Sequence, residues 1–109
     1  MAIYSVSQIT QYIKESLDRD SQLSKLWIEG EVSNLSTSAT KTIYFTLNDK
    51  TTQLKCVMFA SADGQEFLEN GKAVVADGRI SFYEARGQLQ LYINLIQPSG
   101  IGEKQLELE

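Results

Sequence analysis

The chain has 109 residues, of which 42% are hydrophobic, and it carries a formal net charge of −4. This length suits one globular domain with a modest core, and no apolar run approaches a membrane span. The single cysteine, Cys56, excludes an internal disulfide and fits a reducing compartment. Since no signal-peptide pattern is present either, we expect a cytoplasmic protein without a membrane partner.

The acidic charge is unevenly distributed along the chain. Residues 25–60 and 71–98 each carry a net charge of +1, whereas the remaining residues together carry −6. The central segments can therefore form a local cationic groove, but not a strong positive field. We expect any affinity for nucleic acid to be modest.

An amphipathic helix is predicted first. Ser5 and Gln8 have the spacing of a capping box, and apolar residues then recur at helical spacing to about Leu17. From Leu26 the period changes to two, which predicts a first strand with Gly30 at a bend or bulge.

The remaining elements are short strands with one interruption. A polar loop is expected over 34–42, followed by strands over 43–49 and 54–59. Residues 61–70 break the strand pattern, and Asp63 is expected to cap a short helix there.

The last two strands are predicted over 73–83 and 88–96, joined by a tight hairpin in which Gly87 supplies a positive φ. The apolar residues of the fifth strand that are expected to face inward are Leu89, Leu91, Ile93 and Leu95.

This order, a helix followed by β-β-β-α-β-β, describes a mainly β fold: an OB-fold, that is, a five-stranded Greek-key barrel, with an additional N-terminal helix. We assign residues 1–23 to the helix packing on the barrel, 24–98 to the OB-fold domain and 99–109 to an exit segment.

The second and third strands present a mixed outer face. Side chains alternate along a strand, so one row of each strand enters the core while the other faces outward. The outward set combines aromatic, cationic and small side chains: Tyr44, Thr46, Lys55, Val57 and Phe59. This is the composition of a surface on which bases stack while a cation meets phosphate.

Four motifs carry a family resemblance by their order and spacing: Trp27–Asn34, Tyr44–Asp49, Cys56–Phe59 and Tyr83–Gly87. The chain resembles the N-terminal domain of the exodeoxyribonuclease VII large subunit from about residue 4 to residue 106. The resemblance implies a bacterial enzyme that degrades single-stranded DNA from either end, in which the large subunit assembles with copies of a small helical subunit.

The same resemblance implies that this domain binds single-stranded DNA and guides it to a nuclease active site in a region C-terminal to it. We expect the small subunit to bind that missing region, and self-association of the fragment stays open. The chain is thus expected to be an excised domain, with Leu108 and Glu109 as a vector-derived addition.

Three positions depart from the family pattern. Lys41 and its neighbours stand where the family often has Gly-His, Asn48 replaces a basic residue, and Ala85 replaces a proline. The first two changes are expected to weaken or redirect loop contacts with DNA, and the third to loosen the hairpin tip.

The residues expected to contact DNA are Tyr44, Thr46, Lys55, Val57, Phe59, Tyr83, Arg86 and Lys41. Tyr44 and Phe59 are the expected stacking residues, and Lys55 and Arg86 the expected phosphate contacts. The alternatives are packing of the aromatic rings against the helix or a partner chain, and a purely solvating role for Lys41, Lys55 and Arg86. Trp27 is expected to pack under the N-terminal helix.

Catalysis by these residues alone is not expected. Glu29 and Glu31 share a strand face, but no third ligand is evident and the chain contains no histidine. We predict no catalytic residue, metal site or cofactor here, and the metal requirement of the whole enzyme stays open. The rival hypothesis is an assembly module whose strand face binds another subunit.

Overall fold

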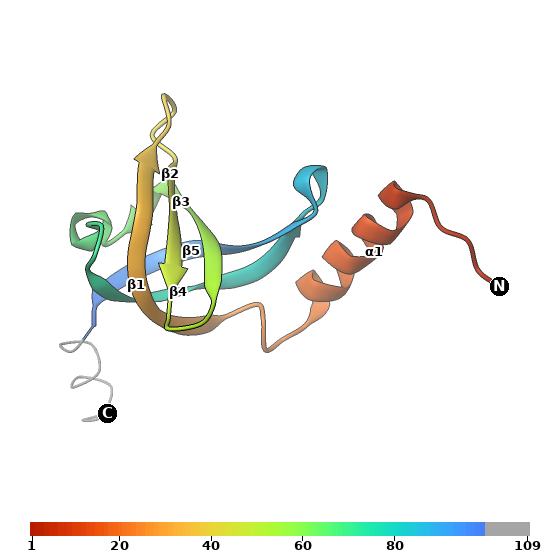
Figure 1. The fold of residues 1–109 in the computed structure, drawn as a ribbon, viewed down its shortest axis with the longest axis horizontal. Coiled ribbons are helices and arrows are strands. Elements are labelled where there is room, and N and C mark those ends of the chain that lie inside the picture. Colours follow the sequence, from red (N-terminus) through yellow and green to blue (C-terminus); the bar gives the residue numbers. More distant parts are fainter. Residues whose placement is uncertain (100–109) are drawn as a thin grey trace.

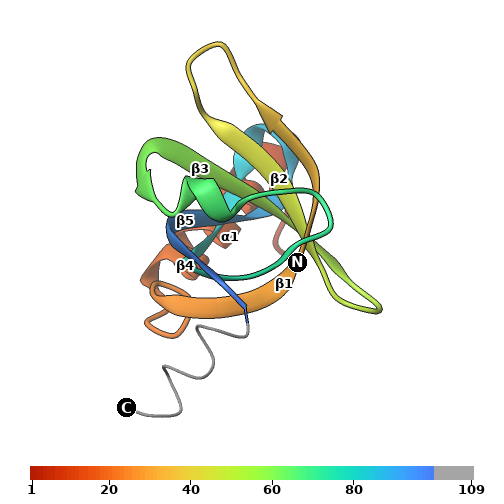
Figure 2. The ribbon, with the colours of Figure 1, turned by 90° about the vertical axis from the view of Figure 1, so that its left-hand side faces the viewer.

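The computed structural model describes residues 1–99. One helix precedes five strands, which close into a single barrel in the order β1-β2-β3-β5-β4 (Figures 1 and 2). The elements are α1 (Val6–Arg19), β1 (Leu26–Thr37), β2 (Ile43–Asn48), β3 (Gln53–Asp63), β4 (Ala73–Tyr83) and β5 (Gln88–Pro98). The predicted mainly β barrel with an N-terminal helix is confirmed. Most of the predicted exit segment, residues 100–109, lies outside the described residues.

The barrel closes through two long-range strand pairings. β1 pairs antiparallel with both β2 and β4, and β3 pairs parallel with β5. The parallel pair needs a crossover, which the chain supplies with a short 3₁₀ turn, η1 (Gln65–Phe67), and with β4.

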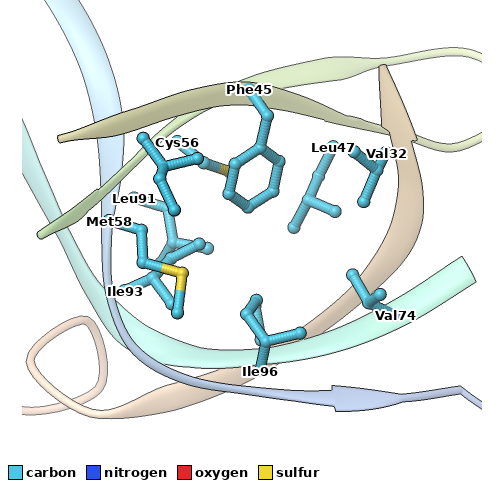
Figure 3. Packing of buried hydrophobic residues seen from close by; sticks show 11 residues of the cluster. Val32, Phe45, Leu47, Cys56, Met58, Val74, Leu91, Ile93 and Ile96 are labelled. Carbon is cyan, nitrogen blue, oxygen red and sulfur yellow. The ribbon is translucent and has the colours of Figure 1, made fainter. Parts of the chain in front are cut away.

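The core is built from the inward rows of all five strands. Figure 3 shows side chains from β1 to β5 converging inside the barrel. Met58, Leu91 and Ile96 are its largest fully buried members. The complete buried cluster is Val32, Ile43, Phe45, Leu47, Cys56, Met58, Val74, Ala76, Leu91, Ile93 and Ile96.

The helix α1 lies outside the barrel. Its predicted capping box is present: the Gln8 backbone N–H donates to Ser5 Oγ at 3.1 Å, and the Ser5 N–H donates to Gln8 Oε1 at 2.8 Å. None of its residues is buried, and it lies beside β4 and the hairpin turn η2 (Glu84–Arg86), as Figure 1 shows. Among residues 1–99, no helix is long and apolar enough to cross a membrane.

The predicted loop over 34–42 is too long, because β1 continues to Thr37. Asn34 adopts a positive φ of 54°, and the pairing with β2 shifts between Ser33 and Ser36. A bulge at Asn34 therefore lets β1 continue to Thr37, although the positive φ of Asn34 interrupts the regular strand.

The predicted short helix begins later than expected. β3 extends to Asp63, and the turn η1 is preceded by Gly64, so Asp63 does not cap it. The Gln65 side-chain amide stabilises this corner by donating to the carbonyl oxygens of Ala60 and Ala62.

The inward row of β5 changes phase halfway along the strand. The pairing with β4 passes from Gly78↔Ile93 directly to Asp77↔Leu95, leaving Asn94 as an extra residue. The prediction is correct for Leu91 and Ile93, but Ile96 replaces Leu95 in the core. Leu89, with 48% of its surface exposed, does not enter the core either. The predicted hairpin is confirmed, with Gly87 at φ 57°.

The corner at Gly64 provides a stability test with a built-in control. Gly64 has φ +93°, and a Cβ there would collide with the backbone of Ile96, whereas Gly71 has φ +89° and open space around the same position. Gly71→Ala should lower the free energy of unfolding by about 1–2 kcal/mol, through φ strain alone. Gly64→Ala should lower it by about 2–5 kcal/mol, because overpacking adds to the strain. Urea denaturation of both variants checks this, and equal losses would show that the corner relaxes freely.

Candidate nucleic-acid interface

One outward-facing row of side chains runs straight across four strands. Tyr44 on β2 pairs with Val57 on β3, Val57 pairs with Tyr92 on β5, and Tyr92 pairs with Arg79 on β4. Because paired residues point to the same side of a sheet, these four side chains form a continuous line on the outside of the barrel.

A second row runs beside the first and is polar throughout. Thr46 pairs with Lys55, Lys55 with Gln90, and Gln90 with Ser81. Thr46 and Ser81 are each only 1% exposed although they face outward. These short side chains thus form a recessed floor, and the longer ones stand around it.

The polar row opens into a groove of about 310 Å³, which we call the basic groove. It lies between β1, β2, β3 and the β4–β5 hairpin. Both predicted phosphate contacts, Lys55 and Arg86, line it. The complete set of lining residues is Asn34, Ser36, Tyr44, Phe45, Thr46, Lys55, Cys56, Val57, Arg86, Gln88 and Gln90.

A second groove, of about 220 Å³, adjoins the first; we call it the aromatic groove. Its lining is Tyr44, Val57, Phe59, Tyr83, Gln90 and Tyr92. Tyr44, Phe59 and Tyr83 expose 45%, 52% and 44% of their surfaces. The two grooves share Tyr44, Val57 and Gln90 and therefore lie side by side.

The structure brings seven of the eight predicted contact residues to these grooves: Tyr44, Thr46, Lys55, Val57, Phe59, Tyr83 and Arg86. The eighth, Lys41, is exposed at a positive φ of 66° in the shortened loop and lines neither groove. A wider hollow of about 640 Å³ meets the basic groove at Asn34, and its charged lining is Glu31, Asp49 and Lys50.

Sequence reasoning missed Gln90 and Tyr92 on β5 and Arg79 on β4. Gln88, Gln90 and Tyr92 line the grooves, and Arg79 holds its guanidinium carbon 4.7 Å from the centroid of the Tyr92 ring. The alternation of β5 places Gln88, Gln90 and Tyr92 on one face. The parallel pairing that sets this face beside β3 joins residues far apart in the chain, so no local sequence pattern predicts it.

The carboxylate of Asp18 joins α1 to the end of both rows. Ser81 Oγ donates to Asp18 Oδ1 at 2.6 Å, and a nitrogen of Arg79 lies 3.9 Å from the same oxygen. Lys14 donates to Oδ2 at 2.7 Å. The hydrogen bonds from Lys14 and Ser81 hold the pKa of Asp18 below its ordinary value. The interface is therefore bounded on this side by α1.

Trp27 lies on β1, beside β4. It is 41% exposed and pairs with Asp77 on β4. The main contacts of α1 are with β4 and η2, not with β1.

The described residues offer little for covalent or metal chemistry. Cys56 is 1% exposed, and burial raises the pKa of its thiol to about 12, so it is a core side chain and not a nucleophile. Within residues 1–99 no three metal-binding side chains lie close together.

A family model described as an OB-fold nucleic acid binding domain matches residues 4–97. The chain belongs to this family. The barrel topology and the sequence match thus agree over almost all of the described residues.

The resemblance to exodeoxyribonuclease VII is also confirmed. The chain is 41% identical to the exodeoxyribonuclease 7 large subunit of Alkaliphilus oremlandii, over 96% of this chain and 26% of the relative. It is 45% identical to that of Ruminiclostridium cellulolyticum, over 98% of this chain and 27% of the relative. The chain thus spans about a quarter of the length of these curated relatives.

Solved structures share the fold at much lower identity. A replication protein A heterotrimer bound to single-stranded DNA matches with a TM-score of 0.62 and 18% identity, over 79% of this chain and 66% of that one. Asparaginyl-tRNA synthetase from Pyrococcus horikoshii matches with a TM-score of 0.61 and 19% identity, over 82% and 22%. At these identities the likeness concerns the barrel alone.

The lowered pKa of Asp18 predicts a specific acid sensitivity. A carboxyl whose folded-state pKa is depressed contributes stability above its unfolded pKa and loses it as the pH falls through the folded value. Between about pH 5 and about pH 2, the wild type should therefore lose more free energy of unfolding than Asp18→Asn does. Urea denaturation at stepped pH, followed by the helical signal in circular dichroism, measures this.

Glu15→Gln is the matched control for this experiment. It removes a carboxylate from the same helix, and within residues 1–99 no hydrogen bond or ion pair of its side chain to the barrel is found. Its pH profile should follow that of the wild type. Parallel profiles for the wild type and Asp18→Asn would contradict a stabilising role for the Asp18 carboxylate.

Proposed function

We propose that this domain binds single-stranded DNA on the outer face of β2, β3 and β5, without strong sequence preference. The observation that carries the proposal is that the two grooves lie side by side. Exposed rings lie in one and two cations in the other, and Tyr44, Val57 and Gln90 belong to both. Single-stranded nucleic acid offers the matching pair of features, flat bases and a charged backbone.

In this proposal the exposed rings receive bases. Tyr44 and Phe59 keep about half of their surfaces open, and Tyr83 stands beside them at the start of the hairpin turn. Stacking on such rings tolerates any base, because every base has a π-face. The floor formed by Thr46 and Val57 leaves room for the bases to approach.

The cations of the basic groove receive phosphates. Lys55 projects from the middle of β3, and Arg86 projects from the hairpin turn across the groove from it. The net charge of −4 provides no general attraction for DNA, so these local contacts must supply most of the electrostatic binding energy. A modest affinity that weakens with salt is the expected outcome.

In the context of a longer protein, we propose that the bound strand is passed to a nuclease active site outside these residues. The support is the name of the relatives, which are large subunits of an exodeoxyribonuclease and about four times as long as this chain. Contacts with a small subunit would also lie outside the domain.

Subunit assembly is the second candidate function. It is favoured by a set of exposed apolar side chains on the N-terminal segment and α1: Ile3, Tyr4, Val6, Ile9 and Tyr12. These side chains lie on the helical part of the molecule, not in the grooves. The two functions therefore predict sensitivity to different substitutions.

Fluorescence anisotropy of labelled oligo-dT at several salt concentrations tests the DNA proposal. Tyr44→Ala should weaken binding by about 5- to 150-fold at every salt concentration, through the loss of one stacked base. Lys55→Ala should instead make the slope of log K against log salt less negative by about 0.7, the value for one phosphate contact on a single strand.

A Trp27→Ala/Lys72→Ala variant is the matched control, since it removes an exposed aromatic residue and an exposed lysine that line neither groove. It should bind as the wild type does. No binding by the wild type at low salt would reject the DNA proposal for this domain and favour assembly.

A further inference from the structure

The described site extends beyond the strands that usually receive nucleic acid in a barrel of this type. The outer face of β2 and β3 is the common binding surface of OB-folds, together with two flanking loops. Here the row that begins at Tyr44 does not stop at β3. It continues through Tyr92 to Arg79 on the far strand of the β4–β5 hairpin.

Tyr92 has the surroundings of a stacking residue. Its ring lines the aromatic groove together with Tyr44 and Phe59, and it is half-buried. It is separated from Tyr44 in the row only by Val57, whose short side chain is 5% exposed. The two tyrosines thus flank a short apolar side chain, an arrangement in which each ring can stack with a different base.

Arg79 is held in place on this face. Its guanidinium lies over the Tyr92 ring, at 4.7 Å from the centroid, and 3.9 Å from a carboxylate oxygen of Asp18. Its side chain is nevertheless 50% exposed. A planar cation fixed against a ring and open to solvent can donate hydrogen bonds to a phosphate or stack beneath a base.

The helix α1 marks the end of this path. Asp18 contacts the last residue of each row: it accepts a hydrogen bond from Ser81 in the polar row and pairs with Arg79 in the row that begins at Tyr44. A carboxylate repels the phosphates of a strand that would continue past it. Figure 1 shows α1 lying along the hairpin at this side of the barrel.

We infer that Tyr92 and Arg79 form a third part of the DNA site, so that the strand crosses the barrel from Tyr44 to Arg79 and ends at α1. This inference rests on the proposed function and assigns that function two further contact residues. Three strand spacings give a path of about 14 Å. A site of roughly four nucleotides, the short end of the range for one OB-fold, suits a path of this length.

The test measures the affinity of wild-type and variant proteins for oligo-dT of increasing length, from two to twelve nucleotides, by anisotropy. Tyr92→Ala should weaken binding of the longest oligonucleotide by about 5- to 150-fold, whereas Tyr92→Phe, which keeps the ring, should bind as the wild type does. In Tyr92→Ala the affinity should also stop rising at a shorter length.

Arg79→Gln is a second variant, useful in case substitution of the half-buried Tyr92 disturbs folding. The side chain of Arg79 is half exposed, so its replacement leaves the core unchanged. It should make the salt slope less negative by about 0.7, and Arg79→Lys should restore the slope but not the full affinity. Circular dichroism confirms that each variant is folded before binding is compared.

The outcomes separate the two proposals. Binding by the wild type that falls in Tyr44→Ala but is unchanged in Tyr92→Ala and Arg79→Gln would overturn the extended path and leave the DNA site on β2 and β3. Absence of wild-type binding would overturn both. Weakened binding in all three variants, with a shorter effective length in Tyr92→Ala, is the expected result.

Discussion

The functional face depends on the parallel pairing of β3 with β5. This pairing closes the barrel and sets Lys55 beside Gln90 and Val57 beside Tyr92, which are residues far apart in the sequence. Without it, the barrel would be an open sheet with β3 and β5 at its two edges, and the aromatic groove would lose the wall that Gln90 and Tyr92 supply. The same closure buries Cys56, Met58 and Leu91 between the strands, so the forces that stabilise the core also assemble the surface.

The outer face combines two requirements that normally conflict. A surface that binds flat rings must present apolar area to water, yet large apolar patches promote association. Here the short side chains of Thr46, Ser81 and Val57 are recessed, and the exposed aromatic rings project above them. The apolar area is therefore divided between separate rings with polar atoms between them. Such a surface suits an extended, flexible ligand better than a flat, rigid partner.

Much of the architecture could be predicted from the sequence because its signals are local. Period-two patterns placed all five strands, and the alternation of β2 and β3 placed Tyr44 and Lys55 on the outer face. The errors arise where non-local pairing overrides the local pattern. A bulge opposite Gly78 shifts the inward row of β5 to Ile96, and hydrogen bonding to a partner strand carries β1 past Asn34. Tyr92 was missed for the same reason, since its neighbours lie on other strands.

The weak attachment of α1 has a consequence for how unfolding of this protein is followed. The helix contributes no buried side chain, and the Asp18–Ser81 hydrogen bond joins it to the barrel. The turn that follows the helix adds a backbone bond from Ile80 N–H to the Leu23 carbonyl oxygen. Undocking it therefore exposes little apolar surface and costs far less free energy than opening the barrel. The helical signal in circular dichroism and the fluorescence of Trp27 on β1 then report two different transitions. A single two-state curve describes the barrel alone.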